Sequence, residues 1–117
     1  MPAKRWLTLS KSSSIFAILL IMGMTNTNSA FAFTADEVVN KMSERDRSTY
    51  LAGMVDGLAQ ARWIADKPKA DGVRCILDWY YQGGDAVQAN IKQWFSRHLK
   101  TEANGLLYVL IKKECGA

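Results

Sequence analysis

The N-terminal segment constrains this chain most, because it predicts both how much of the chain folds and in which compartment. The chain opens with MPAKRWLTLSKSSS, which is basic and lacks acidic residues, and continues into the apolar run 15–24. The residues Ala30, Phe31 and Ala32 then supply an A-x-A site. These three features in this order are typical of a secretory signal peptide. We therefore expect residues 1–32 to be removed after Ala32 and the protein to be periplasmic or secreted.

A membrane anchor is the alternative interpretation of the same segment. Crossing the hydrocarbon core of a bilayer takes about 20 consecutive apolar residues. The run 15–24 is about half as long and ends in the polar residues Thr25-Asn26-Thr27-Asn28. We expect no stable membrane insertion after cleavage.

Residues 33–117 are enough for one small domain. Leaving out Lys4, Arg5 and Lys11 reduces the 15 Lys and Arg residues to 12, against 11 Asp and Glu residues. The basic character of the whole chain therefore belongs to the leader. A nearly balanced domain lacks the clustered positive charge that nucleic-acid binding requires, so we expect no nucleic-acid partner.

Cys75 and Cys115 are the two cysteines of the chain, and both lie after the leader. An even number of cysteines in an oxidising compartment favours a disulfide bond, here Cys75–Cys115. Closing a loop of about 40 residues stabilises a fold by about 4 kcal/mol in the chain-entropy model. A redox site would favour CxxC spacing, and a catalytic cysteine would need a base, for which His98 is the single histidine.

The mature sequence predicts an all-α domain of four to five helices. Thr34 and Glu37 match a capping box, which begins a short helix through about residue 42. Ser43 offers a cap for a longer helix over 44–66. Its apolar residues recur at steps of three and four, as on one face of a helix: Leu51, Met54, Val55, Leu58 and Ala61.

The sequence after residue 72 predicts three further helices. A helix over 73–82 ends at Gly83-Gly84, since glycine readily takes the left-handed conformation there. Asp85 is expected to cap a following helix, whose apolar stripe runs from Val87 through Ile91, Trp94 and Phe95 to Leu99. A last helix starts after Thr101-Glu102 and reaches about Glu114.

The apolar run 106–111 leaves helix and buried strand open. The cap signal, the segment length and the lack of a partner strand favour a helix. A helix that is apolar on nearly every side is expected at the centre of the domain, with Cys115 beside the start of the helix that holds Cys75.

Gly53 and Gly57 lie four residues apart in the long helix. Each glycine costs about 1 kcal/mol of helix propensity relative to alanine, so the pair needs an explanation. Small residues at this spacing form a flat stripe that another backbone or a bulky ring can approach. We expect tight helix packing there.

No strong catalytic signature occurs, so we expect a protein that is not an enzyme and needs no cofactor or metal. There is no Gly-rich phosphate loop, HExxH or GxSxG. With one histidine and a disulfide-bonded cysteine pair, zinc ligands are lacking. His98 is interpreted as a solvated residue or a helix-end charge. Asp56 either pairs with Arg62 or a tyrosine hydroxyl, or is an exposed charge.

Two exposed segments are the expected partner-binding surfaces. The loop Asp66–Gly72 combines a proline and a glycine with alternating charges. The turn Gln82–Asp85 follows three consecutive aromatic residues that cannot all be buried on one helix face, and Tyr81 is the first candidate for exposure. The candidate contact residues are Asp66, Lys67, Lys69, Asp71, Tyr81, Gln82 and Asp85.

The pattern Tyr50-x-x-Gly53-x-x-x-Gly57, a cysteine before an amphipathic helix and a final apolar helix ending in Cys115 resembles a known family. It is similar to the small periplasmic immunity proteins of the Rap and Tai kind, which protect bacteria from type VI secretion effectors that cleave peptidoglycan. The resemblance implies an α-helical domain, often a homodimer, that inhibits a toxin by plugging its active-site cleft with a loop. Members of the family carry further cysteines near the mature N-terminus, and this chain does not.

The leading hypothesis is therefore an exported, non-enzymatic protein-binding domain that acts as an immunity protein against a secreted cell-wall-degrading effector. Two alternatives stay open. A periplasmic acid-stress chaperone would expose apolar surface when its scattered acids become protonated. A structural accessory of a secretion or conjugation apparatus would use the glycine stripe and the aromatic residues for docking.

Overall fold

A computed structural model describes residues 32–116 of the chain, so all of the expected leader except Ala32 lies outside the described residues. The described part consists of helices and one isolated antiparallel bridge between Thr34 and Glu102, which confirms the all-α prediction. None of the described helices has both the length and the apolar character needed to span a bilayer. The elements are η2 (Glu37–Lys41, a short π-helix), α2 (Glu44–Asp66), α3 (Asp71–Gln82), α4 (Gly84–Ser96) and α5 (Ala103–Cys115).

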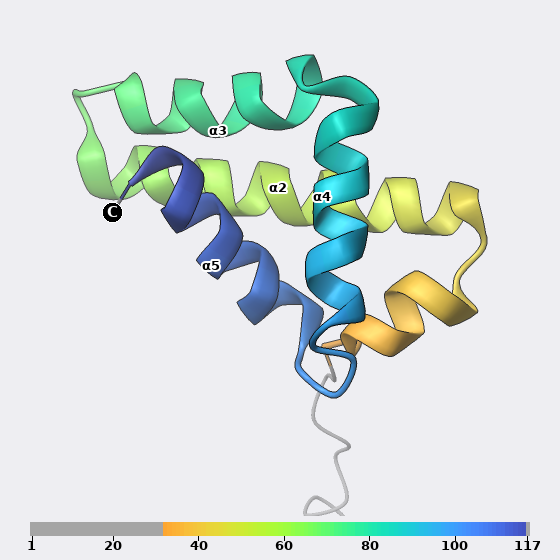
Figure 1. Ribbon diagram of the computed structural model, residues 1–117. Helices are drawn as coiled ribbons and strands as arrows, with labels where there is room; N and C mark the ends of the chain where they lie inside the picture. The colour runs from red at the N-terminus through yellow and green to blue at the C-terminus, as the bar shows by residue number, and fades with distance from the viewer. Residues whose placement is uncertain (1–31, 117) are drawn as a thin grey trace, which may run out of the picture. The chain divides into compact units, whose positions relative to one another are not determined.

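Helix α2 is the longest element, and the later helices pack against it or against each other. Figure 1 shows α3 running back along α2, α4 leaving the end of α3 at a steep angle to it, and α5 lying obliquely so that its C-terminal end reaches the turn between α2 and α3. Helix α5 contacts α2, α3 and α4. Within the described residues, the first element, η2, lies against α4, and the last, α5, lies against α2, α3 and α4.

Local capping signals form as the sequence predicts. The backbone N–H of Thr34 donates to Glu37 Oε2 at 2.8 Å, and the N–H of Glu37 donates to Thr34 Oγ1 at 3.3 Å, which completes the capping box. Ser43 Oγ accepts from the N–H of Asp46 at 3.1 Å at the start of α2. The N–H of Ala103 donates to the Phe33 carbonyl at 2.8 Å, which ties the first described residues to the start of α5.

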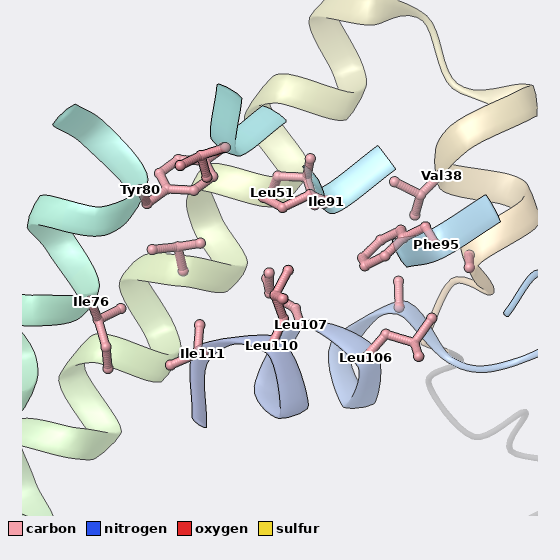
Figure 2. Packing of buried hydrophobic residues seen from close by; sticks show 14 of the residues in the cluster. Val38, Leu51, Ile76, Tyr80, Ile91, Phe95, Leu106, Leu107, Leu110 and Ile111 are labelled. Atoms are coloured by element: carbon pink, nitrogen blue, oxygen red, sulfur yellow. The ribbon is translucent and has the colours of Figure 1, made fainter. Parts of the chain in front are cut away.

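The core is one apolar cluster to which every described helix contributes. Figure 2 shows Phe95 and Ile91 of α4 next to Leu51 of α2 and Val38 of η2, with α5 closing the cluster from the opposite side. Val38, Val55, Phe95 and Leu107 have no exposed surface. Each large apolar side chain buried in this way contributes about 1.5–3 kcal/mol relative to exposure.

The apolar run 106–111 is helical, so the strand alternative is wrong. Leu106, Leu107, Leu110 and Ile111 point into the core. The expectation that this helix is surrounded on nearly every side is also wrong, because Tyr108 and Val109 are half exposed. Helix α5 has its neighbours on one side, and its opposite side faces solvent.

The disulfide Cys75–Cys115 is confirmed. It joins the first half of α3 to the last residue of α5, with 5.8 Å between the two Cα atoms. The Cys115 side chain packs against the core cluster. The bond therefore connects two helices whose cysteines lie 40 residues apart in the sequence.

Three predicted details of the helix ends are corrected. Helix α3 begins at Asp71 rather than at residue 73. Gly83, not Asp85, is the N-cap of α4, because Gly84 takes φ +57° and reverses the chain within the glycine pair, which leaves Asp85 inside the first turn. Helix α4 ends at Ser96, so Leu99 lies beyond it and is partly exposed.

Removal of the disulfide tests how far the domain depends on it. The double variant Cys75→Ser/Cys115→Ser should lower the free energy of unfolding by about 4 kcal/mol, because a loop of about 40 residues is then unconstrained in the unfolded chain. Denaturant unfolding followed by circular dichroism measures the loss. Reductant should destabilise the wild type similarly and leave the double variant unchanged; equal midpoints for oxidised wild type and double variant would contradict the prediction.

The capping box predicts a specific acid sensitivity. The two hydrogen bonds from Thr34, backbone first and hydroxyl second, hold the pKa of Glu37 below its ordinary value of 4.5. The unfolded state then binds the proton more tightly, so this contribution to stability is present above about pH 4.5 and is lost as the pH falls through the lowered pKa.

Glu37→Gln should therefore lose less stability than the wild type when the pH is lowered from neutral to below 4.5. Asp36, whose pKa is lowered chiefly by the hydrogen bond from Asn40, titrates in both proteins and cancels in the comparison. Thr34→Val keeps the backbone donor and removes the hydroxyl, so its pH dependence should be intermediate. Parallel stability curves for wild type and Glu37→Gln would show that the box does not couple to pH.

Candidate functional site

The predicted loop Asp66–Gly72 is a short turn between two helices. Asp66 is the last residue of α2 and Asp71 the first of α3, which leaves 67–70 as the connection. Lys67 and Lys69 are exposed. Gly72 is buried inside α3, and a Cβ there would collide with the guanidinium of Arg62, so this position admits only glycine without rearrangement.

The base of this turn is held by Arg62. Its Nε pairs with the carboxylate of Asp66 one helical turn later, and its Nη1 donates to the carbonyl of Gly116 at 2.9 Å. Only 19% of the Arg62 side chain is exposed, so its charge is directed to these two acceptors rather than to solvent. The disulfide lies next to the Gly116 contact. The turn is therefore fixed at its base, and Lys67, Pro68 and Lys69 are exposed on it.

Tyr81 is exposed, as predicted, and it meets Asp56. Its hydroxyl donates to Asp56 Oδ1 at 2.7 Å, and this hydrogen bond is the main reason that the pKa of Tyr81 rises to about 12. Its ring packs edge-to-face on Tyr80, which is buried, with ring centroids 4.9 Å apart. Asp56 is exposed on α2, so the bond links α2 to α3 at the surface. Of the alternatives for Asp56, the tyrosine hydroxyl is the observed partner.

The two predicted binding segments do not form one surface. Gln82 and Asp85 are exposed at the C-terminal end of α3, whereas Asp66, Lys67, Lys69 and Asp71 lie at its N-terminal end. A helix of 12 residues separates the two groups by about 18 Å. A partner that contacts one segment therefore has no direct reason to reach the other.

The glycine pair does not mediate packing within the domain, which corrects the expectation for Gly53 and Gly57. Both are exposed, and a Cβ added at either position would meet no atom of residues 32–116 within 4 Å. The buried side of α2 is instead lined by Leu51, Val55 and Ala59. The exposed side of α2 is unusual, because between Gly53 and Ala65 its exposed residues include only one charged side chain, Asp56. That carboxylate already accepts a hydrogen bond from the Tyr81 hydroxyl.

A groove between α2 and α5 continues this uncharged side. We call it the α2–α5 groove; its volume is about 270 Å³ and its apolar lining comprises Leu58, Ala61, Ala65, Ile76, Tyr108 and Ile111. Arg62, Asp66 and Lys112 line it as well, so it opens toward the α2–α3 turn. Leu58 and Ala61 belong to the apolar stripe of α2 that the sequence predicts, and Ala65 extends that stripe by one turn. Which part of the stripe stays open depends on tertiary packing.

Within residues 32–116 no three His, Cys, Asp or Glu side chains lie close enough together to hold a metal ion. His98 is half buried beyond the end of α4, with its ring 4.5 Å from that of Trp94 by centroids. Trp94 in turn donates from its indole to the Leu106 carbonyl at 3.2 Å. His98 therefore lies near the end of α4, but it packs on Trp94 and is not fully solvated.

Comparisons with family models, with curated proteins and with solved structures found no match to this chain.

Substitutions of Tyr81 separate its hydroxyl from its ring. Tyr81→Phe should lower the free energy of unfolding by less than about 1 kcal/mol, because the lost hydrogen bond is at an exposed position. Tyr81→Ala should cost about 1 kcal/mol more, since the edge-to-face contact with Tyr80 is also lost. Denaturant unfolding of both variants measures the difference. Equal losses would mean that the hydroxyl–carboxylate bond, and not the ring contact, secures α3 to α2.

Proposed function

We propose that this chain is an exported, non-enzymatic protein-binding domain that neutralises a secreted cell-wall-degrading effector by occluding its active site. The proposal draws on the secretory leader that the sequence predicts and on the resemblance to periplasmic immunity proteins. The disulfide fits an oxidising compartment.

The observation that carries the proposal is the exposed, fixed turn between α2 and α3. A segment that occludes a cleft binds more tightly when it is already rigid, because less conformational freedom is lost on binding. This turn is four residues long, and its base is held by the Arg62 contacts to Asp66 and Gly116 and by the disulfide. Lys67 and Lys69 project from it and carry positive charge toward a partner.

The turn has a suitable size and charge for this role. Peptidoglycan hydrolases act on a polymer that extends through an open cleft, and a narrow turn between two helices can enter such a cleft where a flat surface cannot. The two lysines would meet acidic residues in the cleft. The mostly uncharged outer side of α2 leads up to the turn and adds area that a complex can bury.

Affinity capture with the mature, oxidised protein tests the proposal. The bait is incubated with envelope and secreted fractions, and the bound proteins are identified by mass spectrometry. We expect one stoichiometric partner with cell-wall hydrolase activity, which the purified domain inhibits at a molar ratio of about one, as a tight occluding inhibitor does. Lys67→Glu/Lys69→Glu should weaken inhibition at least about tenfold, a loss of about 1.4 kcal/mol of binding free energy.

Lys92→Glu/Lys100→Glu is the matched control, because both lysines are exposed and lie away from the turn, on α4 and beyond its end. It should inhibit as well as the wild type. A broad set of weakly held client proteins, with binding that increases at low pH, would instead support the chaperone alternative. Capture of structural components of a secretion or conjugation apparatus would support the accessory alternative.

A further inference from the structure

We propose that the α2–α5 groove binds a short segment of the partner protein that presents a large apolar side chain next to a carboxylate. The inference rests on the proposed function, because it assumes that the ligand is a protein. It adds a second contact site, separate from the turn, and specifies which kinds of side chain that site would bind.

The groove is shaped for an apolar side chain. Its floor is formed by Ile76 and Ile111, which are nearly fully buried, and its walls by Leu58, Ala61 and Tyr108. Small-molecule sites usually enclose about 300–1,000 Å³, and this groove is below that range at about 270 Å³. A hollow of this size fits one or two side chains of a protein segment.

Several residues that line the groove expose apolar surface to solvent. Tyr108, which lines the groove, is 53% exposed, and Ala61 and Ala65 on the α2 side of the groove are exposed as well. Apolar surface of this kind, continuous with a groove, is typical of a protein interaction site. Tyrosine at such a wall supplies a large contact area at low cost in side-chain entropy.

Charge at one end of the groove selects the sequence of the segment. The guanidinium of Arg62 is engaged by Asp66 and by the Gly116 carbonyl. Lys112 lines the groove and is exposed, and it has no ion-pair partner among residues 32–116. Lys67 follows directly at the end of α2 and adds a further positive charge. A carboxylate beside the bound apolar side chain would complement this end.

The same charge argues against a second copy as the occupant. In a two-fold dimer the same patch lies on both sides of the interface, so Lys112 would face a surface of its own sign. An acidic segment of a different protein would instead be attracted by the positive charge of Lys112, which would repel the same lysine of a second copy.

A displayed library of random short peptides tests the groove without the natural partner. The library is selected on mature, oxidised wild type and, in parallel, on Ala61→Glu, which introduces a charge and a longer side chain into the groove wall. Ala61 is exposed and glutamate is a good helix former, so the variant should fold. Peptides enriched only on the wild type should share a large apolar residue within a few positions of Asp or Glu.

Synthetic versions of the enriched peptides then measure the individual contacts by calorimetry. Their affinity should fall at least about tenfold with Ala61→Glu and several-fold with Lys112→Glu, and the second effect should shrink at high salt. Ala86→Glu and Lys92→Glu place the same changes at exposed positions of α4 and should leave the affinity unchanged. The absence of peptides that prefer the wild type, or enrichment of basic peptides, would overturn the inference.

Light scattering separates the remaining alternative. A wild type that is dimeric in solution and becomes monomeric with Ala61→Glu would assign the groove to a second copy and overturn the inference. The outcome is also distinct from that of the proposed function. A hydrolase that Ala61→Glu captures and inhibits as well as the wild type would reject the groove and retain occlusion by the turn. Peptides that bind the groove as expected, when no hydrolase is captured, would retain the groove and reject the proposed function.

Discussion

The Cys75–Cys115 bond joins the start of α3 to the end of α5, and the organisation of the adjacent surface depends on this contact. Helix α5 has core neighbours on one side only and ends close to the end of the described chain, so the disulfide holds its last turn in place. Arg62 adds a second link at the same point through the Gly116 carbonyl. Together they fix α5 relative to α2, and with it the width of the groove between these helices.

Helix α2 has one side buried in the core and another side exposed to solvent. Leu51, Val55 and Ala59 face the core, whereas Gly53, Ala61 and Ile64 face solvent. A surface helix normally places charged residues opposite its apolar stripe, which keeps it soluble and defines its inner side. From Gly53 to Ala65 the outer side of α2 lacks free charge over about three turns, although it is exposed. Such an arrangement is consistent with a helix that is covered only in a complex.

The turn after α2 and the α2–α5 groove meet at Arg62. This side chain contributes to the groove lining, pairs with the residue that ends α2 and fills the space left by Gly72 at the start of α3. A partner that inserts into the groove would therefore contact the same framework that supports the turn. Two modest contacts on one rigid framework can combine into tight binding, since both are ordered before the partner arrives.

The order and type of the helices, the capping box, the Ser43 cap and the disulfide could all be predicted from the amino-acid sequence. They depend on interactions within three or four residues, or, for the disulfide, on a count that leaves one pairing. The exposure of Tyr81 followed from geometry as well, because three consecutive aromatic residues span too wide an arc of a helix to be buried together. What the sequence left undetermined was which part of the apolar stripe of α2 is buried in the core and which part borders the groove, where Gly53 and Gly57 point, and that Gly84 would displace Asp85 as the start of α4. These outcomes follow from how whole helices pack against one another, and the energy differences that select among the faces are summed over many distant contacts that no short stretch of sequence contains.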